Sequence, residues 1–232
     1  MTFPRATTHG PIQQIRDNLY FVRGSFPMAP GMRIGRTMTI VRTDEGLVIL
    51  NSVRLKDERE LDALGPVKHV IKLSDSHGID DPYYVDHYGA QFWCLEGAKD
   101  APPTARTLGS ECPIPGARLC ELKNTRGWLE TTLLLPGDGG TMIATDVLQN
   151  YVDQENVSLM ARLMTPLMGF KGGLIIAPMW RKFQKIKPGD LPETMASVLS
   201  CDFDTLVCGH GPPIVGAAAA KVQAAVKGLA AA

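Results

Sequence analysis

The sequence has no excess of charge of either sign. Its 232 residues include 24 Lys and Arg and 24 Asp and Glu, so the formal net charge is zero. Proteins that bind nucleic acid or an acidic membrane through charge usually carry a basic excess. The sequence also lacks an apolar run long enough to cross a bilayer. We therefore expect neither a nucleic acid nor a membrane as a partner.

The cysteine pattern of a disulfide framework is also missing. Five cysteines, an odd number, are scattered along the chain without a C-x-x-C pair. Disulfides persist mainly in oxidising compartments, so this usage indicates reduced thiols. The first residues contain no apolar segment of the kind found in secretory signals. Together these features predict a cytoplasmic protein.

Strand and helix patterns alternate in both halves of the chain. With 44% hydrophobic and 21% charged residues, the composition is that of one globular domain over residues 1–232. Strand-like apolar runs cover residues 12–15, 19–22, 37–41, 47–50, 67–73, 91–95, 118–123, 129–135, 141–144 and 206–208. Helical patterns cover residues 56–64, 81–88, 155–168, 190–200 and 221–231. The order predicts an α/β (α+β) fold.

One loop between a strand and a helix is dense in His and Asp. It follows the predicted strand 67–73 and contains Asp75, His77 and Asp80. Asp146 follows a strand of the second half, and His210 follows the last strand. Ligands bind beyond the carboxyl ends of strands in open α/β sheets. We therefore predict that these five side chains converge on one pocket.

Two other segments favour simpler interpretations. Residues 24–35, rich in Gly, Pro and Met, read as a loop over one end of the sheet. In the predicted helix 155–168, Met160, Met164 and Met168 share one face, which usually indicates core packing. The apolar, Met-rich residues of these two segments would also suit contact with an apolar substrate or a homodimer interface.

Five short segments resemble the metallo-β-lactamase fold superfamily in their order and spacing. Residues 44–51, DEGLVILN, resemble its "dGlvliD" segment with Asn51 in place of Asp, and residues 208–212, CGHGP, resemble its late "pGHGpp" loop. The other segments are residues 17–22, 67–74 and 143–148. The resemblance covers most of the chain. It implies an αββα sandwich, in which two mixed β-sheets stack face to face and helices flank them, and a metal-dependent hydrolase with a pocket bordered by residues 24–35 and 155–181.

The metal-binding motif of that superfamily is degenerate here. Its pattern H-x-H-x-D-H falls on residues 75–80, where only His77 matches. Asp75 and Asp80 stand at the first and last His positions, and Ile79 replaces the Asp. No His lies near residues 124–127, where the middle His is expected. A second register on residues 86–90 is rejected because it would put Pro82 and Tyr84 at the first two His positions.

The remaining candidates form a ligand set that is rich in oxygen. Asp75, His77, Asp80, Asp146 and His210 would suit manganese or magnesium better than zinc. We expect at most one divalent metal ion and no complete dinuclear zinc site. The alternatives are structural. Asp75 and Asp80 would cap the following helix, and the other three would be turn or hydrogen-bonding residues.

Three functional hypotheses follow from this ligand set. In the first, His77, Asp146 and His210 hydrolyse a small-molecule ester, lactone or thioester through water held by one metal ion or by a His–Asp pair. In the second, the protein is a non-catalytic binding or structural member that has lost its metals. The third, an iron pair handling oxygen, is weaker because it needs a full ligand set. Arg33, Arg36 and Arg126 either bind an anionic substrate or are solvated surface residues.

Overall fold

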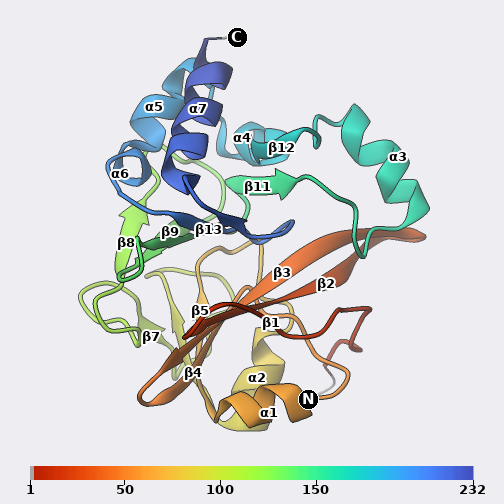
Figure 1. Cartoon of the computed structure of the whole chain (residues 1–232), viewed down its shortest axis with the longest axis vertical. Coiled ribbons are helices and arrows are strands. Elements are labelled where there is room, and N and C mark those ends of the chain that lie inside the picture. Colours follow the sequence, from red (N-terminus) through yellow and green to blue (C-terminus); the bar gives the residue numbers. More distant parts are fainter. Residues whose placement is uncertain (1–2, 232) are drawn as a thin grey trace.

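The computed structural model describes residues 3–231, and its first half forms a seven-stranded sheet in sequence order (Figure 1). The strands are β1 (Gln13–Arg16), β2 (Leu19–Ala29), β3 (Met32–Thr43), β4 (Gly46–Leu50), β5 (Val67–Lys72), β6 (Gln91–Cys94) and β7 (Arg106–Thr107). The first four pair antiparallel, and β4 to β7 pair parallel. Parallel neighbours need a crossover connection. Helices α1 (Arg59–Leu64) and α2 (Asp81–Tyr88) lie in the first two of these connections.

The second half forms a five-stranded mixed sheet in the order β14-β13-β10-β9-β8. Its strands are β8 (Arg118–Glu121), β9 (Thr131–Leu135), β10 (Thr141–Ile143), β13 (Thr205–Val207) and β14 (Ile214–Val215). A separate antiparallel pair consists of β11 (Leu148–Tyr151) and β12 (Gly173–Ile176). The helices are α3 (Leu159–Leu167), α4 (Pro178–Gln184), α5 (Leu191–Thr194), α6 (Ala196–Leu199) and α7 (Ala218–Ala230), with a 3₁₀ turn at Pro188–Asp190.

Three apolar clusters show how these elements are layered. One cluster joins the two sheets through side chains such as Leu50, Ile71 and Leu133. A second packs α1 and α2 against the outer face of the first sheet, and a third packs α4 to α7 against the second sheet. The predicted αββα sandwich is thereby confirmed. The layers also explain why β4 is an unbroken apolar run, because a central strand covered on both faces has no solvent side.

The long β2–β3 hairpin replaces the loop predicted for residues 24–35. Ser25 pairs with Gly35 and Phe26 with Ile34, and the chain turns at Gly31 with φ of 73°. Gly and Pro lower strand propensity locally, but pairing along the two strands, with one irregularity between Pro27 and Ala29, outweighs it. Residue 35 also requires a small side chain, since a Cβ there would lie 3.1 Å from the Glu155 carbonyl oxygen.

Helix α3 differs from its prediction in both length and packing. It begins after Ser158, whose hydroxyl accepts a hydrogen bond from the Ala161 amide, and is shorter than residues 155–168. Met160, Met164 and Met168 are 50%, 45% and 37% exposed, so their assignment to the core is wrong. The buried side of α3 is its small-residue side, at Ala161 and Thr165. No helix within residues 3–231 has the length and apolar character needed to span a membrane.

Helix α2 has the predicted bounds and contains a buried carboxyl group. Asp81 lies in its first turn and accepts a hydrogen bond from the Ser52 hydroxyl. Burial raises the pKa of Asp81 from 3.8 to about 6, although the Ser52 hydrogen bond and the charge of Lys72 oppose this shift. Ionised Asp81 therefore destabilises the folded chain.

We expect Asp81→Asn to change how stability depends on pH. The folded pKa is raised, so stability from Asp81 is greatest below pH 3.8 and is lost as pH rises through about 6. A shift of about two pKa units corresponds to roughly 3 kcal/mol. The variant should be more stable than the parent by up to that amount at pH 7 and should match it near pH 4, by chemical denaturation. Asp86→Asn, at an exposed position of the same helix, is the control. Parallel stability curves for Asp81→Asn and the parent would contradict this account.

Candidate functional site

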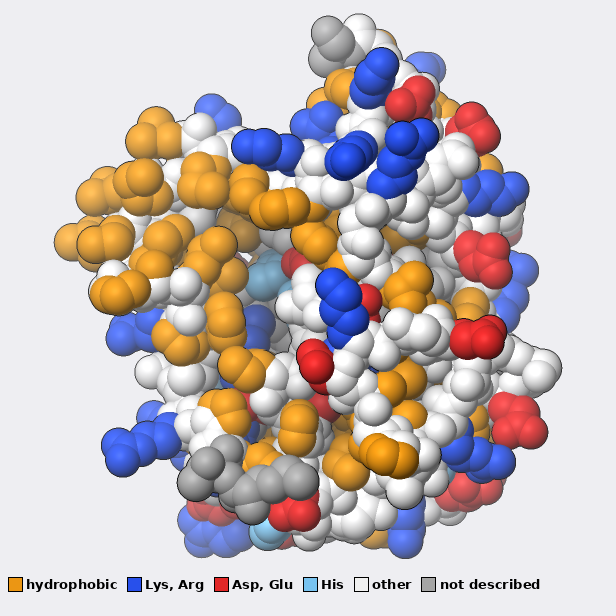
Figure 2. Space-filling model, turned by 180° about the vertical axis from the view of Figure 1, so that it is seen from behind, with side chains coloured by type: hydrophobic (Ala, Val, Ile, Leu, Met, Phe, Trp, Pro, Cys, Tyr) orange, Lys and Arg blue, Asp and Glu red, His pale blue; other side chains and the backbone are white. Residues whose placement is uncertain are grey.

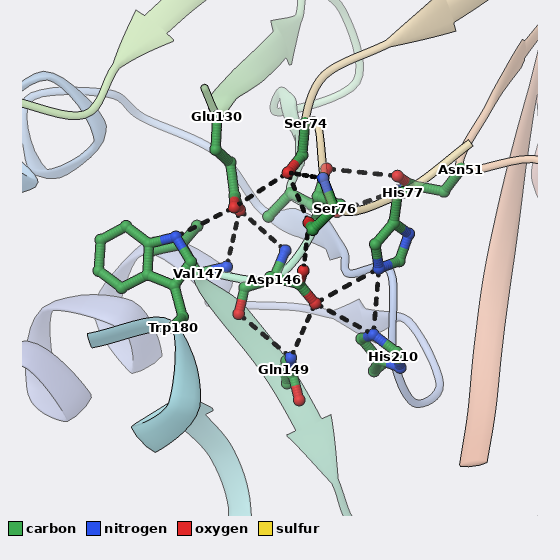
Figure 3. A network of polar contacts seen from close by, with 12 residues as sticks. Asn51, Ser74, Ser76, His77, Glu130, Asp146, Val147, Gln149, Trp180 and His210 are labelled. Carbon is green, nitrogen blue, oxygen red and sulfur yellow. Dashed lines mark hydrogen bonds and ion pairs between the residues drawn. The ribbon is translucent and has the colours of Figure 1, made fainter. Parts of the chain in front are cut away.

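Three side chains from three strand ends meet at one edge of the sandwich. His77 follows β5, Asp146 follows β10 and His210 follows β13. His77 Nε2 lies 3.2 Å from His210 Nε2 and 3.3 Å from Asp146 Oδ1, and His210 Nε2 lies 3.1 Å from the same oxygen (Figure 3). The structure thus brings three of the five predicted site residues into contact, and a fourth, Asp75, lines the same pocket without touching them.

Glycines on both sides of His210 allow this approach. A Cβ at Gly209 would lie 2.9 Å from His77 Cε1 and 3.0 Å from the Thr145 carbonyl oxygen. Gly211 has φ of 89°, and a Cβ there would overlap the Asn150 carbonyl oxygen. The G-H-G sequence is therefore a tight turn, as one alternative proposed, and the turn places His210 in the cluster.

The protonation of His210 follows from its two neighbours. Its Nδ1 lies 2.7 Å from the Gly35 carbonyl oxygen, which assigns a proton to Nδ1 and turns Nε2 toward Asp146. Burial lowers the pKa of His210, but the hydrogen bond to Asp146 and its charge outweigh burial and raise it. Burial opposes ionisation of Asp146, but both imidazoles hold its pKa well below the usual range. Without a bound metal ion, His210 and Asp146 therefore form an ion pair.

Hydrogen bonds fix both oxygens of the Asp146 carboxylate. The Ser76 hydroxyl donates to Oδ2 at 2.5 Å, and Gln149 Nε2 donates to Oδ1 at 3.2 Å. Ser76 is in turn 2.7 Å from the Ser74 hydroxyl. Asn51 donates to the Ala144 carbonyl oxygen and so supports the loop before Asp146. These contacts set the carboxylate orientation before any ligand arrives.

Glu130 binds the backbone of the loop that carries Asp146. It was not among the predicted site residues. Its Oε1 accepts hydrogen bonds from the amides of Asp146 and Val147, each at 2.8 Å. Its Oε2 accepts from the indoles of Trp128 and Trp180, each at 3.0 Å. Burial and then the charge of Asp146 raise the pKa of Glu130 to about 7. One signal was available: Glu130 is a charged residue inside the apolar run 129–135.

Asp75 and Asp80 do not join the cluster. The Asp75 carboxylate accepts from the amides of Lys99 at 2.8 Å and Leu129 at 3.2 Å, so it ties two loops together. Asp80 is 1% exposed and forms a buried ion pair with Arg36. Their prediction as ligands of an ion shared with His77, Asp146 and His210 is not supported, because backbone amides and a guanidinium already satisfy both carboxylates. Asp80 occupies the N-cap position of α2, but its side chain makes no capping hydrogen bond.

Arg36 and His87 do not contact the cluster of His77, Asp146 and His210. Arg36 is buried against Asp80, so it is not a solvated surface arginine. His87 lies on the exposed side of α2 and stacks on Tyr83, with ring centroids 5.1 Å apart. That position agrees with rejection of the second register.

A large pocket opens above the cluster. Its volume is about 950 Å³, and His77, Asp146 and His210 lie among its lining residues. Most of the wall is apolar or aromatic, for example Phe26, Met28, Ile34, Phe170 and Phe183. Figure 2 shows a hollow with a histidine side chain inside it, next to a broad apolar area. Apolar walls around a few polar groups are typical of small-molecule sites.

The donor set fits one metal ion. Among residues 3–231, the groups of three or more metal-ligating side chains reduce to His77, Asp146 and His210, whose ligand atoms lie within 4.8 Å of one another. Two imidazoles and one carboxylate occur in catalytic zinc sites and in non-haem iron sites that keep positions open. Without Asp75 and Asp80 the set is no longer rich in oxygen, so the preference for manganese or magnesium loses its basis. The Gly35 carbonyl orients His210 as an outer ligand partner would.

Comparison with known proteins bears on the fold. No family model and no curated protein sequence matches the chain. Similar solved structures include a B3 metallo-β-lactamase with an active-site glutamic acid, with 15% identity, TM-score 0.57 and coverage of 95% of this chain and 89% of that one. A metallo-β-lactamase from Erythrobacter litoralis in its mono-zinc form has 12% identity, TM-score 0.54 and coverage of 94% and 96%. A flavo di-iron protein mutant from Thermotoga maritima has 12% identity and TM-score 0.65, with 94% of this chain matching 60% of that one. The chain is a divergent protein with the metallo-β-lactamase fold.

Proposed function

We propose that this protein hydrolyses an ester, lactone or thioester with an apolar body, using one divalent ion bound by His77, Asp146 and His210. The observation that carries the proposal is the convergence of these three side chains inside a large apolar pocket. The similar mono-zinc metallo-β-lactamase adds support for a one-ion site on this fold.

The reaction needs a nucleophilic water and a polarised carbonyl. A bound ion would supply both, by lowering the pKa of water and by acting as a Lewis acid. Water oxygen then bonds to the carbonyl carbon, the bond to the leaving oxygen or sulfur breaks, and the leaving group takes the proton. The chain contributes orientation. The Gly35 carbonyl oxygen accepts a hydrogen bond from His210 Nδ1, and the Ser76 hydroxyl donates one to Asp146 Oδ2. The apolar walls bind the substrate body and keep bulk water away from the reacting carbon.

One observation favours the non-catalytic alternative. His210 and Asp146 already satisfy each other through a hydrogen bond of 3.1 Å, so the cluster is stable as an ion pair without a metal. When it is protonated, His210 Nε2 donates a hydrogen bond to Asp146. When it is unprotonated, its lone pair could instead bind a metal ion. Metal content and turnover therefore distinguish the two functions.

Metal analysis is the first test. Protein purified without chelators should contain about one equivalent of a transition metal by elemental analysis. His210→Ala should lose most of it, because it removes one of three ligands, whereas His87→Ala, at an exposed position outside the pocket, should keep it. Two equivalents of zinc would show that the single-ion assignment is wrong. An absence of metal in reconstituted protein would favour the non-catalytic function.

Hydrolysis of a substrate panel is the second test. Esters, lactones and thioesters with short and long acyl chains should be compared by kcat/KM. We expect higher values for the longer chains because the pocket walls are apolar. Asp146→Asn should reduce kcat/KM by about 100-fold or more. Absence of turnover over the panel in metal-loaded protein would contradict the hydrolase.

Glu130→Gln tests a positioning role. The substitution removes a buried charge, but it also puts an NH₂ group where one carboxylate oxygen accepts from two N–H donors, so we expect a net loss of about 2 kcal/mol in the free energy of unfolding. Metal affinity should fall by about 10- to 100-fold, because the amide of Asp146 loses part of its anchor. Glu121→Gln, at an exposed position of β8, is the matched control. A purely structural role would lower stability and leave metal affinity at the parent value.

A further inference from the structure

Charge is distributed unevenly along this neutral chain. Residues 156–189 contain no Asp or Glu but include six basic residues, so the rest of the chain has 18 basic and 24 acidic residues. The six are Arg162, Lys171, Arg181, Lys182, Lys185 and Lys187, of which all but Arg181 are exposed. The net charge of zero therefore conceals a basic segment. That segment includes α3, β12 and α4.

Helix α3 presents an unusual apolar face to solvent. Its exposed side chains are Leu159 at 73%, Met160 at 50%, Leu163 at 65%, Met164 at 45% and Leu167 at 82%. The helix buries only Ala161 and Thr165, and Figure 1 shows it standing beside the tip of the β2–β3 hairpin, away from the layered core. Soluble helices normally turn such a face toward the core.

The apolar face of α3 continues over neighbouring elements. Figure 2 shows apolar side chains gathered over this corner of the molecule, with basic side chains along its border. Met28 on the hairpin is 50% exposed and Phe183 on α4 is 52% exposed, and both also line the pocket. A continuous exposed apolar area of this kind marks a surface for a partner.

The charges decide between two kinds of partner. A second copy docked through the same face would bring its own basic segment against this one, which opposes association. A bilayer with anionic lipids offers opposite charge at its surface and an apolar layer beneath it. Helices that lie in a membrane interface combine an apolar face with Lys and Arg beside it.

We propose that α3 and the basic residues of 156–189 form a surface that binds bilayers containing anionic lipid. The apolar side chains of α3 insert among the acyl chains, and the five exposed basic residues contact the headgroups. This proposal replaces the expectation, based on net charge, that no membrane is a partner. It concerns binding alone and does not depend on catalysis.

Vesicle flotation with the full chain tests the proposal. The protein should bind phosphatidylcholine vesicles that contain phosphatidylglycerol, and about tenfold or more weakly when that anionic lipid is omitted. High salt should weaken the binding to anionic vesicles, because it screens exposed charges. Absence of binding to anionic vesicles, or equal binding to both compositions, would overturn the proposal.

Two variants separate the apolar and charged contributions. Leu163→Ser with Leu167→Ser should reduce binding about tenfold or more. Lys171→Glu with Lys182→Glu should do so without altering the apolar face. The controls are Val215→Ser, at a position 63% exposed on β14, and Lys221→Glu with Lys227→Glu on α7, and they should bind like the parent.

Light scattering across a range of protein concentrations tests the alternative partner, which is a second copy of this chain. A dimer that the two serine substitutions abolish, together with absence of vesicle binding, would show that a second copy covers α3 and would overturn the proposal. Thermal unfolding checks each variant. If the variant with two serine substitutions does not fold, the variant with Lys171→Glu and Lys182→Glu still tests the proposal, because both lysines are exposed and their replacement should not disturb the fold.

Discussion

The buried carboxylate of Glu130 connects the parts of the structure that make the site. It lies directly before β9 and accepts hydrogen bonds from the amides of Asp146 and Val147, the Trp180 indole on α4 and the Ser74 hydroxyl after β5. Charge-assisted hydrogen bonds are stronger than neutral ones, and leaving such partners unpaired in the interior is costly. Because Glu130 holds the loop before β11, the position of Asp146 relative to both histidines follows from the core.

The group of His77, Asp146 and His210 offers fewer metal ligands than the H-x-H-x-D-H motif that the sequence resembles. Asp75 and Asp80 fall where the resembled sequence pattern has histidines, and their carboxylates are bound by backbone amides or by Arg36. Those residues therefore stabilise loops around the pocket. What remains at the pocket floor is one carboxylate between two imidazoles, which is enough for an ion pair or for one metal.

The sequence predicts the layers well because burial periodicity is a local property. The bounds of α2 and the presence of β5 could be predicted from residues within each element. His77, Asp146 and His210 could be brought together because each follows a strand end. The roles of Asp80 and Glu130 could not be predicted, since they depend on Arg36 and Trp180, which are distant in sequence. Exposure of Met160 was missed for a related reason: an amphipathic pattern shows which face is apolar, but not what covers it.

The network around Glu130 also limits how this sequence can vary. Its carboxylate has donors from Trp128, Trp180 and Ser74, so replacing it alone leaves buried N–H and O–H groups without acceptors. Replacing one tryptophan alone leaves a hole beside a buried acid. Related chains should therefore keep the group intact or exchange its members together. Such correlated substitutions would identify relatives that keep this one-carboxylate, two-histidine arrangement, which a search for the complete histidine motif would miss.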